Sequence, residues 1–327
     1  MTHHLVLGAG GIGRAATTHL VARGHTVTLA SRSGIVALRP WEELPGGSDA
    51  VTVATVDAAD PAALTLLATG AASIVNAINP PSYTSWEQDW PPVAEALLLA
   101  AERSGAGLVT IGNLYNYGRV DAPMSEETVE APNGHKGALR AAMWQEARSR
   151  HEAGRLRATE LRASDYFGPG AQARVSLLND SVISRAAKGS AALLPMGVAD
   201  AAHSWTYLPD IGELAAVLAT DDRSWGRVWH VPTAPARTVR EVAADVARLT
   251  GHRAPAVRVV PRPLITVLGT VVPLLKEVRE TRHQLERPFV IDATRAEQTF
   301  GLSATPWDEA LTATVVALGG TPAPARA

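Results

Sequence analysis

Three glycines near the start of the chain have the spacing that lets a backbone approach a phosphate group. Gly8, Gly10 and Gly13 follow the apolar run 5–7 and precede residues 14–23, which have the periodicity of an amphipathic helix. A helix that begins after such a turn offers free N–H groups and the positive end of its dipole to an anion. The spacing predicts a dinucleotide-binding turn, with a plain glycine-rich loop as the alternative. The residues of this turn are Gly8, Gly10, Gly11, Ile12 and Gly13.

The residues after the next strand bear on which dinucleotide the turn would bind. Residues 25–30 alternate as a strand does, and Ser31, Arg32 and Ser33 follow them. A carboxylate at this place binds the ribose 2′-hydroxyl of NAD, whereas an arginine accommodates the 2′-phosphate of NADP. Arg32, supported by the two serines, therefore favours NADP over NAD. An arginine that is simply solvated in a loop is the alternative.

Two further strands end in polar residues that can border the same ligand. The strand predicted at 51–56 ends in Asp57, which can bind the adenine amine or cap its own loop. A fourth strand ends at Asn76 and leads into Ala77 and Asn79, after which prolines turn the chain. We include these four residues among the candidates for cofactor binding.

Strands and helices alternate along the first half of the chain. Asp60 and Pro61 are typical of a helix start, residues 91–92 are a Pro-Pro pair predicted to open another helix, and residues 107–111 form a fifth strand. Short connections between such elements are typical of a doubly wound α/β fold, in which helices cover both faces of a parallel sheet. Ligands of this fold bind beyond the carboxyl ends of the strands.

The composition argues against several classes of function. The 327 residues are 46% hydrophobic, carry a formal net charge of -2 and include no cysteine. The near-neutral charge offers no electrostatic footprint for nucleic acid or an anionic membrane. The lack of cysteine removes disulfides and thiolate catalysis, and the histidines lack the spacing of a metal site. The apolar run 263–275 is too short to span a bilayer and predicts a buried helix. A strand begins almost at once, without a signal segment, so we expect a cytoplasmic protein.

Motifs in the middle of the chain carry a family resemblance. The sequence Gly-Asn-Leu-Tyr-Asn-Tyr-Gly occupies residues 112–118, and Leu-Arg-Ala-Ser-Asp-Tyr-Phe-Gly-Pro-Gly occupies residues 161–170. Further motifs lie at 132–140, 205–211 and 300–311. On these motifs the chain resembles the extended short-chain dehydrogenase/reductases, the NAD(P)-dependent epimerase/dehydratase-like proteins, over nearly its whole length.

The resemblance implies an organisation in two parts. A Rossmann domain that binds NAD(P) is expected at residues 1–169, completed by a return segment at 203–232. A smaller, C-terminal substrate-binding lobe is expected from residues 170–202 and 233–327. The resemblance also implies a small-molecule substrate. Members of the family often form homodimers through the helices after the fourth and fifth strands, and the sequence leaves both a monomer and such a homodimer open.

The catalytic positions of the family hold other residues in this chain. The family uses a serine after the fifth strand and a tyrosine and lysine spaced YxxxK on the next helix; Asn113, Lys136 and Arg140 stand at these positions. Because residues i and i+4 share a helical face, Lys136 and Arg140 are expected to face the nicotinamide pocket together. A lysine can donate a proton, an arginine can only bind hydroxyls or anions, and an asparagine amide can orient a carbonyl oxygen. Tyr115 and Tyr117 are the reserve candidates for a proton donor.

Lysine is rare in this chain. There are only three lysines among 30 basic residues, so a surface cation here is more often an arginine. This scarcity favours a specific role for Lys136. The alternative is a plain lysine on a helix face, beside a solvated Arg140, in a fold that has lost catalysis.

Three functions remain open from the sequence. The first is an NADP-dependent oxidoreductase of the atypical short-chain dehydrogenase/reductase type, with hydride transfer to or from a small-molecule carbonyl, imine or enone and Lys136 in place of the usual tyrosine. The second is a non-catalytic NADP(H) sensor similar to the NmrA-like proteins. The third, a sugar-nucleotide epimerase or dehydratase, follows from the family name, but those reactions use the missing tyrosine as a base.

Overall fold

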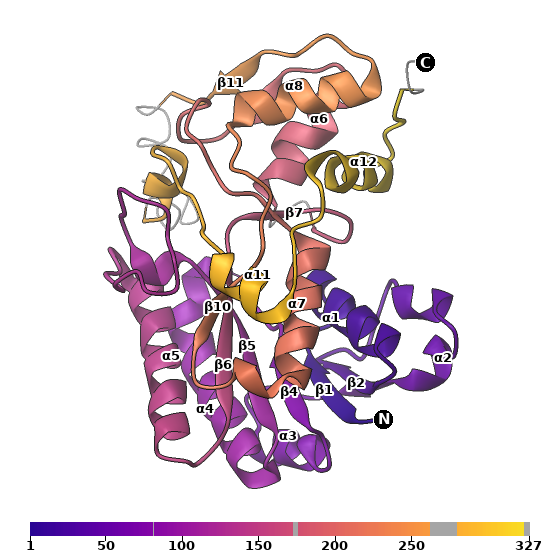
Figure 1. Cartoon of the computed structure of the whole chain (residues 1–327), viewed down its shortest axis with the longest axis vertical. Coiled ribbons are helices and arrows are strands. Elements are labelled where there is room, and N and C mark those ends of the chain that lie inside the picture. The colour runs from indigo at the N-terminus through magenta and orange to yellow at the C-terminus, as the bar shows by residue number, and fades with distance from the viewer. Residues whose placement is uncertain (81, 173–175, 262–279, 324–327) are drawn as a thin grey trace.

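A parallel sheet of seven strands forms the centre of the protein (Figure 1). The computed structural model describes residues 1–80, 82–172, 176–261 and 280–323. The strands lie in the order β10-β6-β5-β4-β1-β2-β3, and all six neighbouring pairs are parallel. The strands are β1 (His3–Leu7), β2 (Thr26–Ser31), β3 (Val51–Thr55), β4 (Ser73–Asn76), β5 (Gly107–Asn113), β6 (Ala158–Ala163) and β10 (Val228–His230). The predicted doubly wound, Rossmann-type α/β fold is confirmed.

The strand order reverses between β1 and β4, which lie side by side in the sheet. Chain connections leave these two strands in opposite directions, so their carboxyl ends border a crevice where open α/β sheets bind ligands. Leu7 pairs with both Ala30 of β2 and Asn76 of β4. The segments that follow β1, β2 and β4 therefore begin at the same edge of the sheet.

Two apolar clusters cover the two faces of the sheet. On one face α1 (Gly11–Ala22) and α7 (Leu208–Thr220) pack on each other and on the strands. Gly212 of α7 allows this close approach, because a side chain there would begin 2.5 Å from the Cβ of Ala15. On the other face lie α3 (Pro61–Ala68), α4 (Trp86–Ser104) and α5 (His135–Glu152). Helix α2 (Gly47–Ala50) lies at the β3 edge, and no described helix is long and apolar enough to cross a membrane.

Helix α4 begins earlier than the sequence predicts. The sequence predicts that Pro91 and Pro92 open this helix, but it starts at Trp86 and contains both prolines. The two prolines lie past the first four residues of this helix, whose N–H groups have no partner within it, so each proline removes a helical hydrogen bond. Trp86 and Trp90 are buried, at 2% and 0% exposure, so packing of this first turn offsets the hydrogen bonds that the prolines cannot make. The predicted start at Pro91 is wrong because it rests on local signals alone.

A smaller lobe lies beyond the carboxyl edge of the sheet (Figure 1). It has its own apolar cluster, which joins residues near 167–199 to residues near 239–257 and 307–318. Its elements are β7 (Tyr166–Phe167), a π-helical turn (Leu178–Ile183), α6 (Ser184–Ala186), β8 (Ala192–Leu194), β9 (Thr206–Tyr207), α8 (Val239–Thr250), β11 (Val257–Val259) and α12 (Trp307–Ala317). Helix α11 (Thr294–Phe300) instead packs against β10, where Phe300 contacts Trp229. The buried helix predicted at 263–275 lies outside the described residues.

Asp210 joins the sheet to the segment that leads into α12. It stands in the first turn of α7, and its carboxylate accepts hydrogen bonds from the backbone N–H (3.0 Å) and hydroxyl (2.6 Å) of Thr305. Burial nevertheless raises the pKa of Asp210 to about 6. The folded protein therefore holds a proton that the unfolded chain releases near pH 4, so folding stability is lost as the pH rises from about 4 through about 6.

Asp210→Asn removes this titration. From pH 4 to pH 7 we expect the free energy of unfolding to fall by about 1–2 kcal/mol more in the wild type than in the variant. Urea unfolding at a series of pH values measures this difference. Asp200→Asn is the control, because its exposed carboxylate pairs with Arg240, which lowers its pKa and reverses the sign of any trend. Stability curves for the wild type and Asp210→Asn that run parallel across this range would contradict the assignment.

Candidate functional site

The glycine turn places the N-terminus of α1 at the end of β1. Gly8 has a φ of +102°, and a side chain there would begin 2.7 Å from the carbonyl oxygen of Ala77. A side chain at Gly13 would begin only 1.8 Å from the carbonyl oxygen of Gly8. Both positions therefore require glycine. Gly8 needs it for its positive φ and for the close approach of Ala77, and Gly13 needs it only because a side chain would collide with Gly8.

The same turn has the features that a dinucleotide diphosphate requires. Gly10 is the N-cap of α1, no side chain caps the helix, and its first turn contains no acidic residue. A side chain built at Gly10 would meet no atom within 4 Å, so the space above the turn is open. Gly11 and Ile12 follow as the first helical residues, with N–H groups that have no acceptor within the helix. The backbone thus fits an anion at this point.

Ser31, Arg32 and Ser33 lie at the end of β2, beside this turn. The Ser31 hydroxyl accepts a hydrogen bond from the N–H of Gly34, and the Ser33 hydroxyl accepts one from Ile35. These bonds shape a tight turn that leaves Arg32 exposed. No carboxylate stands among the three residues, so the feature that usually selects a free 2′-hydroxyl is missing here.

The remaining cofactor candidates follow β3 and β4. The carboxylate of the exposed Asp57 accepts the N–H of Ala59, so it caps the turn before α3. Asn76 is fully buried, and its side-chain oxygen accepts the N–H of Ile78. Ala77 is half-buried with its carbonyl against Gly8, and Asn79 is exposed. All these residues lie at the carboxyl edge of the sheet, where the sequence places them.

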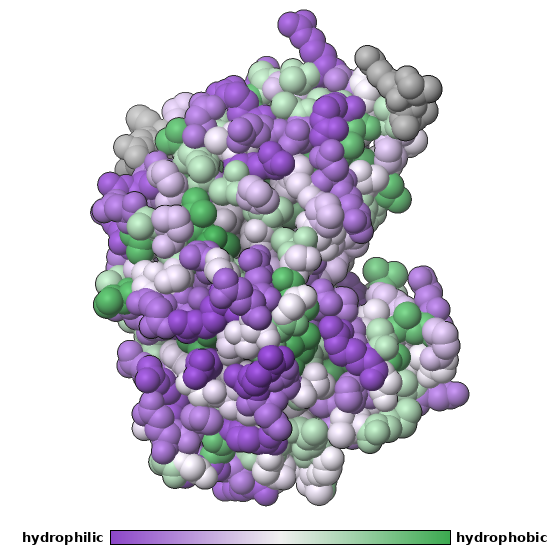
Figure 2. All heavy atoms as spheres, viewed as in Figure 1, coloured by the Kyte–Doolittle hydropathy of each residue, from purple (hydrophilic) through white to green (hydrophobic). Residues whose placement is uncertain are grey.

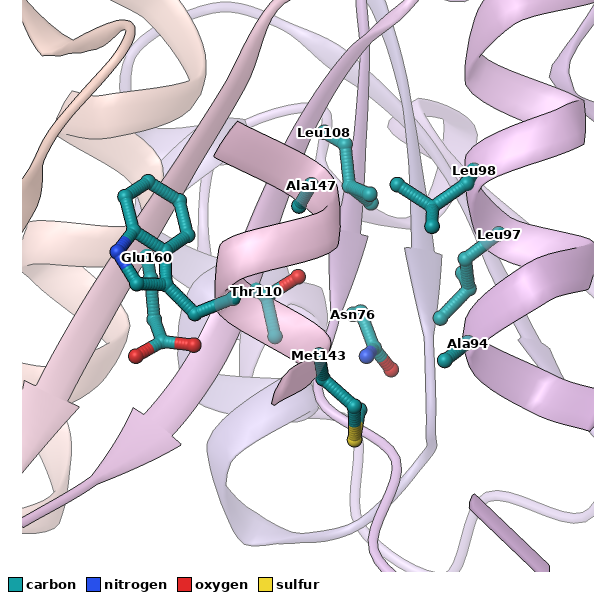
Figure 3. Close-up of a pocket in the computed structure, with 10 residues that line it drawn as sticks. Asn76, Ala94, Leu97, Leu98, Leu108, Thr110, Met143, Ala147 and Glu160 are labelled. Carbon is teal, nitrogen blue, oxygen red and sulfur yellow. The ribbon is translucent and has the colours of Figure 1, made fainter. Parts of the chain in front are cut away.

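Asn76 also borders a cavity behind the sheet (Figure 3). Leu97 and Leu98 of α4 line one side, and Thr110 of β5 and Glu160 of β6 line the other. The cavity measures about 20 Å³, which suits a single water rather than a substrate. It lies between the sheet and the α4–α5 layer, so it is separate from the crevice at the carboxyl edge.

Lys136 lies in the first turn of α5 and is 1% exposed. Its Nζ is 3.3 Å from Oε2 of Glu280, and its backbone N–H donates to Oε1 of Glu280 at 2.8 Å. The same carboxylate lies 2.9 Å from Nδ1 of His135. Gly134, the N-cap, has no side chain to cap α5, and a Cβ there would begin 2.0 Å from the Glu280 side chain. Glu280 thus places a negative charge at the N-terminus of α5, where the helix dipole makes such a charge favourable.

Glu280 is the residue at this site that sequence reasoning missed. It lies 144 positions after Lys136, in a part of the chain without a recognisable motif. Only the folding of the later segment back onto α5 brings the two residues together. No spacing rule could have revealed the contact.

Arg140 shares the buried face of α5 with Lys136, as the i, i+4 spacing predicts, but its guanidinium packs on α4. Its central carbon lies 4.2 Å from the ring centre of Trp90 and 5.1 Å from that of Trp86. Tyr115 is half-buried and stacks on Trp86, with 6.3 Å between the two ring centres. Asn113 ends β5, and its side-chain oxygen accepts the N–H of Tyr115. The structure therefore groups Arg140, Tyr115 and the tryptophans, and ties Lys136 to Glu280.

Tyr117 lies in the core, at 1% exposure. Burial lowers the pKa of His230 to about 4, so this histidine is neutral and donates from Nδ1 to the carbonyl oxygen of Asp292. Its Nε2 then accepts the Tyr117 hydroxyl at 2.7 Å. Burial also raises the pKa of Tyr117 to about 12. Arg162 lies over the tyrosine ring, which makes Tyr117 part of a buried polar network.

A hollow opens between the smaller lobe and the part of the sheet domain that carries α1 and α2 (Figure 2). The carboxyl edge of the sheet faces the lobe, so the glycine turn and the ends of β2 and β4 point toward this side of the molecule. Within the described ranges, no three His, Asp or Glu side chains gather in the way that a metal site requires.

Comparison with known proteins identifies the family. Residues 4–231, more than half of the chain, match the model of the NAD dependent epimerase/dehydratase family. This chain is a member of that family. The match spans the glycine turn, the sheet and β10, and it confirms the resemblance found in the sequence. Among curated proteins, no sequence matches the chain.

Solved structures of this family share the fold over almost the whole chain. The dTDP-glucose 4,6-dehydratase DesIV from Streptomyces venezuelae, a double mutant with NAD and DAU bound, has a TM-score of 0.74 and 19% identity, covering 97% of this chain and 96% of its own. The UDP-glucuronic acid 4-epimerase from Bacillus cereus, in complex with UDP-glucuronic acid and NAD, has a TM-score of 0.76 and 16% identity, covering 97% and 99%. At these identities the likeness concerns the fold alone.

Two glycine substitutions in the turn compare a position that has no room for a side chain with one that has room. Gly13→Ala forces α1 away from β1, so we expect the free energy of unfolding to fall by about 2 kcal/mol or more. Gly10→Ala has room for its methyl group and a φ of -73°, so its unfolding should match the wild type. Urea unfolding of both variants checks this, and equal losses would contradict the turn geometry.

Proposed function

We propose that this protein is an NADP(H)-dependent oxidoreductase that reduces or forms a small-molecule carbonyl, imine or enone, with Lys136 as the proton-transfer group. The single observation that carries the proposal is the buried ion pair of Lys136 and Glu280 in the first turn of α5. This is the position at which the family has its catalytic tyrosine. A chain that had lost catalysis would have no need to bury a scarce lysine there beside a carboxylate from a distant segment.

The chain's own residues have separable roles in this proposal. The N-terminus of α1 would hold the diphosphate, and Arg32, flanked by the two serines, would bind the 2′-phosphate. When bound, the nicotinamide supplies or accepts the hydride. In the direction of reduction, Lys136 gives a proton from Nζ to the substrate oxygen or nitrogen, while the Glu280 carboxylate holds the ammonium in place. The Asn113 amide orients the substrate oxygen.

The ligands of the structural neighbours favour a nicotinamide dinucleotide as cofactor. Both structures described above contain NAD, and the UDP-glucose 4-epimerase from Thermus thermophilus is also in complex with NAD, with a TM-score of 0.73, 20% identity and coverage of 98% and 99%. The preference for NADP is this chain's own feature and depends on Arg32. Sugar-nucleotide chemistry ranks lower, because Lys136 replaces the tyrosine base.

Cofactor preference is tested by titration. We expect NADPH to bind at least about tenfold more tightly than NADH, because Arg32 pairs with the 2′-phosphate. Arg32→Ala should remove this difference and leave NADH affinity unchanged, with nicotinamide fluorescence as the measurement. Arg39→Ala is the matched control, since Arg39 follows in the same loop and pairs with Glu42 at 3.2 Å. Equal affinity of the wild type for both dinucleotides would remove the NADP assignment.

Catalysis is tested with Lys136. Oxidation of NADPH by a panel of carbonyl, imine and enone acceptors should fall by about 100-fold or more in Lys136→Met, because the proton donor is lost, while NADPH affinity changes little. Lys188→Met is the control, because Lys188 is an exposed lysine of the smaller lobe. Full turnover in Lys136→Met would exclude this lysine as the donor. Tight NADPH binding without turnover of any acceptor by the wild type would favour the sensor.

A further inference from the structure

Arg14 differs from the other buried arginines of the protein. Among the described residues, four arginines are at most 9% exposed. Three of them have partners: Arg150 contacts the carboxylates of Glu95, Glu102 and Glu146, Arg162 contacts Glu130 and Glu160, and Arg140 lies on two tryptophan rings. Within the described ranges, no carboxylate or hydrogen-bond acceptor contacts the side chain of Arg14. Burial lowers its pKa, and no neighbouring charge opposes that shift.

The side chain of Arg14 lies at the entrance to α1. Its Nη2 is 3.4 Å from the point where a side chain of Gly170 would begin, and the Cα of Gly11 lies 3.7 Å from the same point. The guanidinium therefore lies beside Gly170, where the turn 168–171, which leads into the smaller lobe, meets the first turn of α1. Gly170 has a φ of +81° and leaves the space that this contact needs.

The arrangement is unfavourable for the protein alone. Most of the Arg14 side chain is removed from water, and its guanidinium has no counter-charge, which costs free energy. The N-terminus of a helix is itself positive, so a cation in the first turns adds a repulsion that an acidic residue would not. The first turn of α1 contains no acid and no capping side chain. A bound anion would compensate both the guanidinium and the helix terminus.

We infer that Arg14 is a phosphate-binding residue, whose guanidinium donates to a phosphate oxygen held between the N-terminus of α1 and the turn 168–171. A guanidinium suits this ligand because its fork of N–H donors matches two phosphate oxygens. The phosphate can belong to the diphosphate of the dinucleotide or to a phosphorylated substrate that enters from the smaller lobe. The first case deepens the proposed function and rests on it, whereas the second does not.

Binding of defined probes distinguishes the two sources. Affinities of NADPH, UDP and inorganic pyrophosphate are measured by calorimetry for the wild type, Arg14→Lys and Arg14→Met. We expect Arg14→Met to weaken at least one probe by about 10- to 100-fold and Arg14→Lys to lie between, because a lysine keeps the charge but loses the fork. A loss for NADPH assigns the cofactor diphosphate. A loss for UDP with NADPH unchanged assigns the substrate side.

Arg23→Met is the matched control for this series. Arg23 ends the same helix on its exposed side and pairs with Glu213 at 3.2 Å, so its loss should leave all three affinities unchanged. Equal weakening in Arg14→Met and Arg23→Met would overturn the inference, since it would reflect net charge alone. Unchanged affinities in Arg14→Met would also overturn it.

Stability of the ligand-free protein gives an independent readout. Because the largely buried side chain of Arg14 has no counter-charge, Arg14→Met should raise the unfolding temperature of the free protein while it weakens binding. An arginine with a purely structural role would lower the unfolding temperature when replaced, and that result would overturn the inference. If the wild type binds UDP or pyrophosphate but no dinucleotide, the proposed function fails while the role of Arg14 is still decided. If it binds no probe, both fail.

Discussion

The contact between Gly13 and the carbonyl oxygen of Gly8 is the steric constraint on which the candidate site depends. It lets α1 begin directly above the end of β1, because any side chain at Gly13 would occupy the place of that oxygen. Ala77 closes on the same turn from β4, across the point where the strand order reverses. The free N–H groups of α1, the loop after β2 and the end of β4 consequently share one edge of the sheet.

Contacts made by buried charged side chains hold the other elements of the site together. Removing a charge from water is costly unless a partner compensates it, and most buried charges here have partners that lie far away in the sequence. Glu280 pairs with Lys136 and caps α5, Arg162 bridges Glu130 and Glu160, and two tryptophans enclose the guanidinium of Arg140. These contacts tie α5 to both α4 and the later segment. Arg14 alone among the buried arginines described lacks such a partner.

The smaller lobe is joined to the sheet at several places rather than through one linker. Asp210 connects α7 to the segment before α12, and α11 returns to pack against Trp229 of β10. The lobe has its own apolar cluster, but these contacts set its position over the carboxyl edge. A ligand held by the glycine turn therefore lies close to the turn 168–171, where the chain enters the lobe.

The sequence by itself determined five of the seven strands of the sheet and the glycine turn, because apolar runs and glycine spacing are local signals of backbone geometry. It also determined that Lys136 and Arg140 share one face of α5, since helical periodicity requires it, whereas the burial of this face came from the tertiary structure. It misplaced the start of α4, where burial of Trp86 and Trp90 outweighed the two prolines. Only the tertiary structure decided the partners: Glu280 for Lys136, the tryptophans for Arg140 and His230 for Tyr117. Those contacts join residues up to 144 positions apart, and whether a charge or hydroxyl is compensated depends on what the folded chain brings beside it.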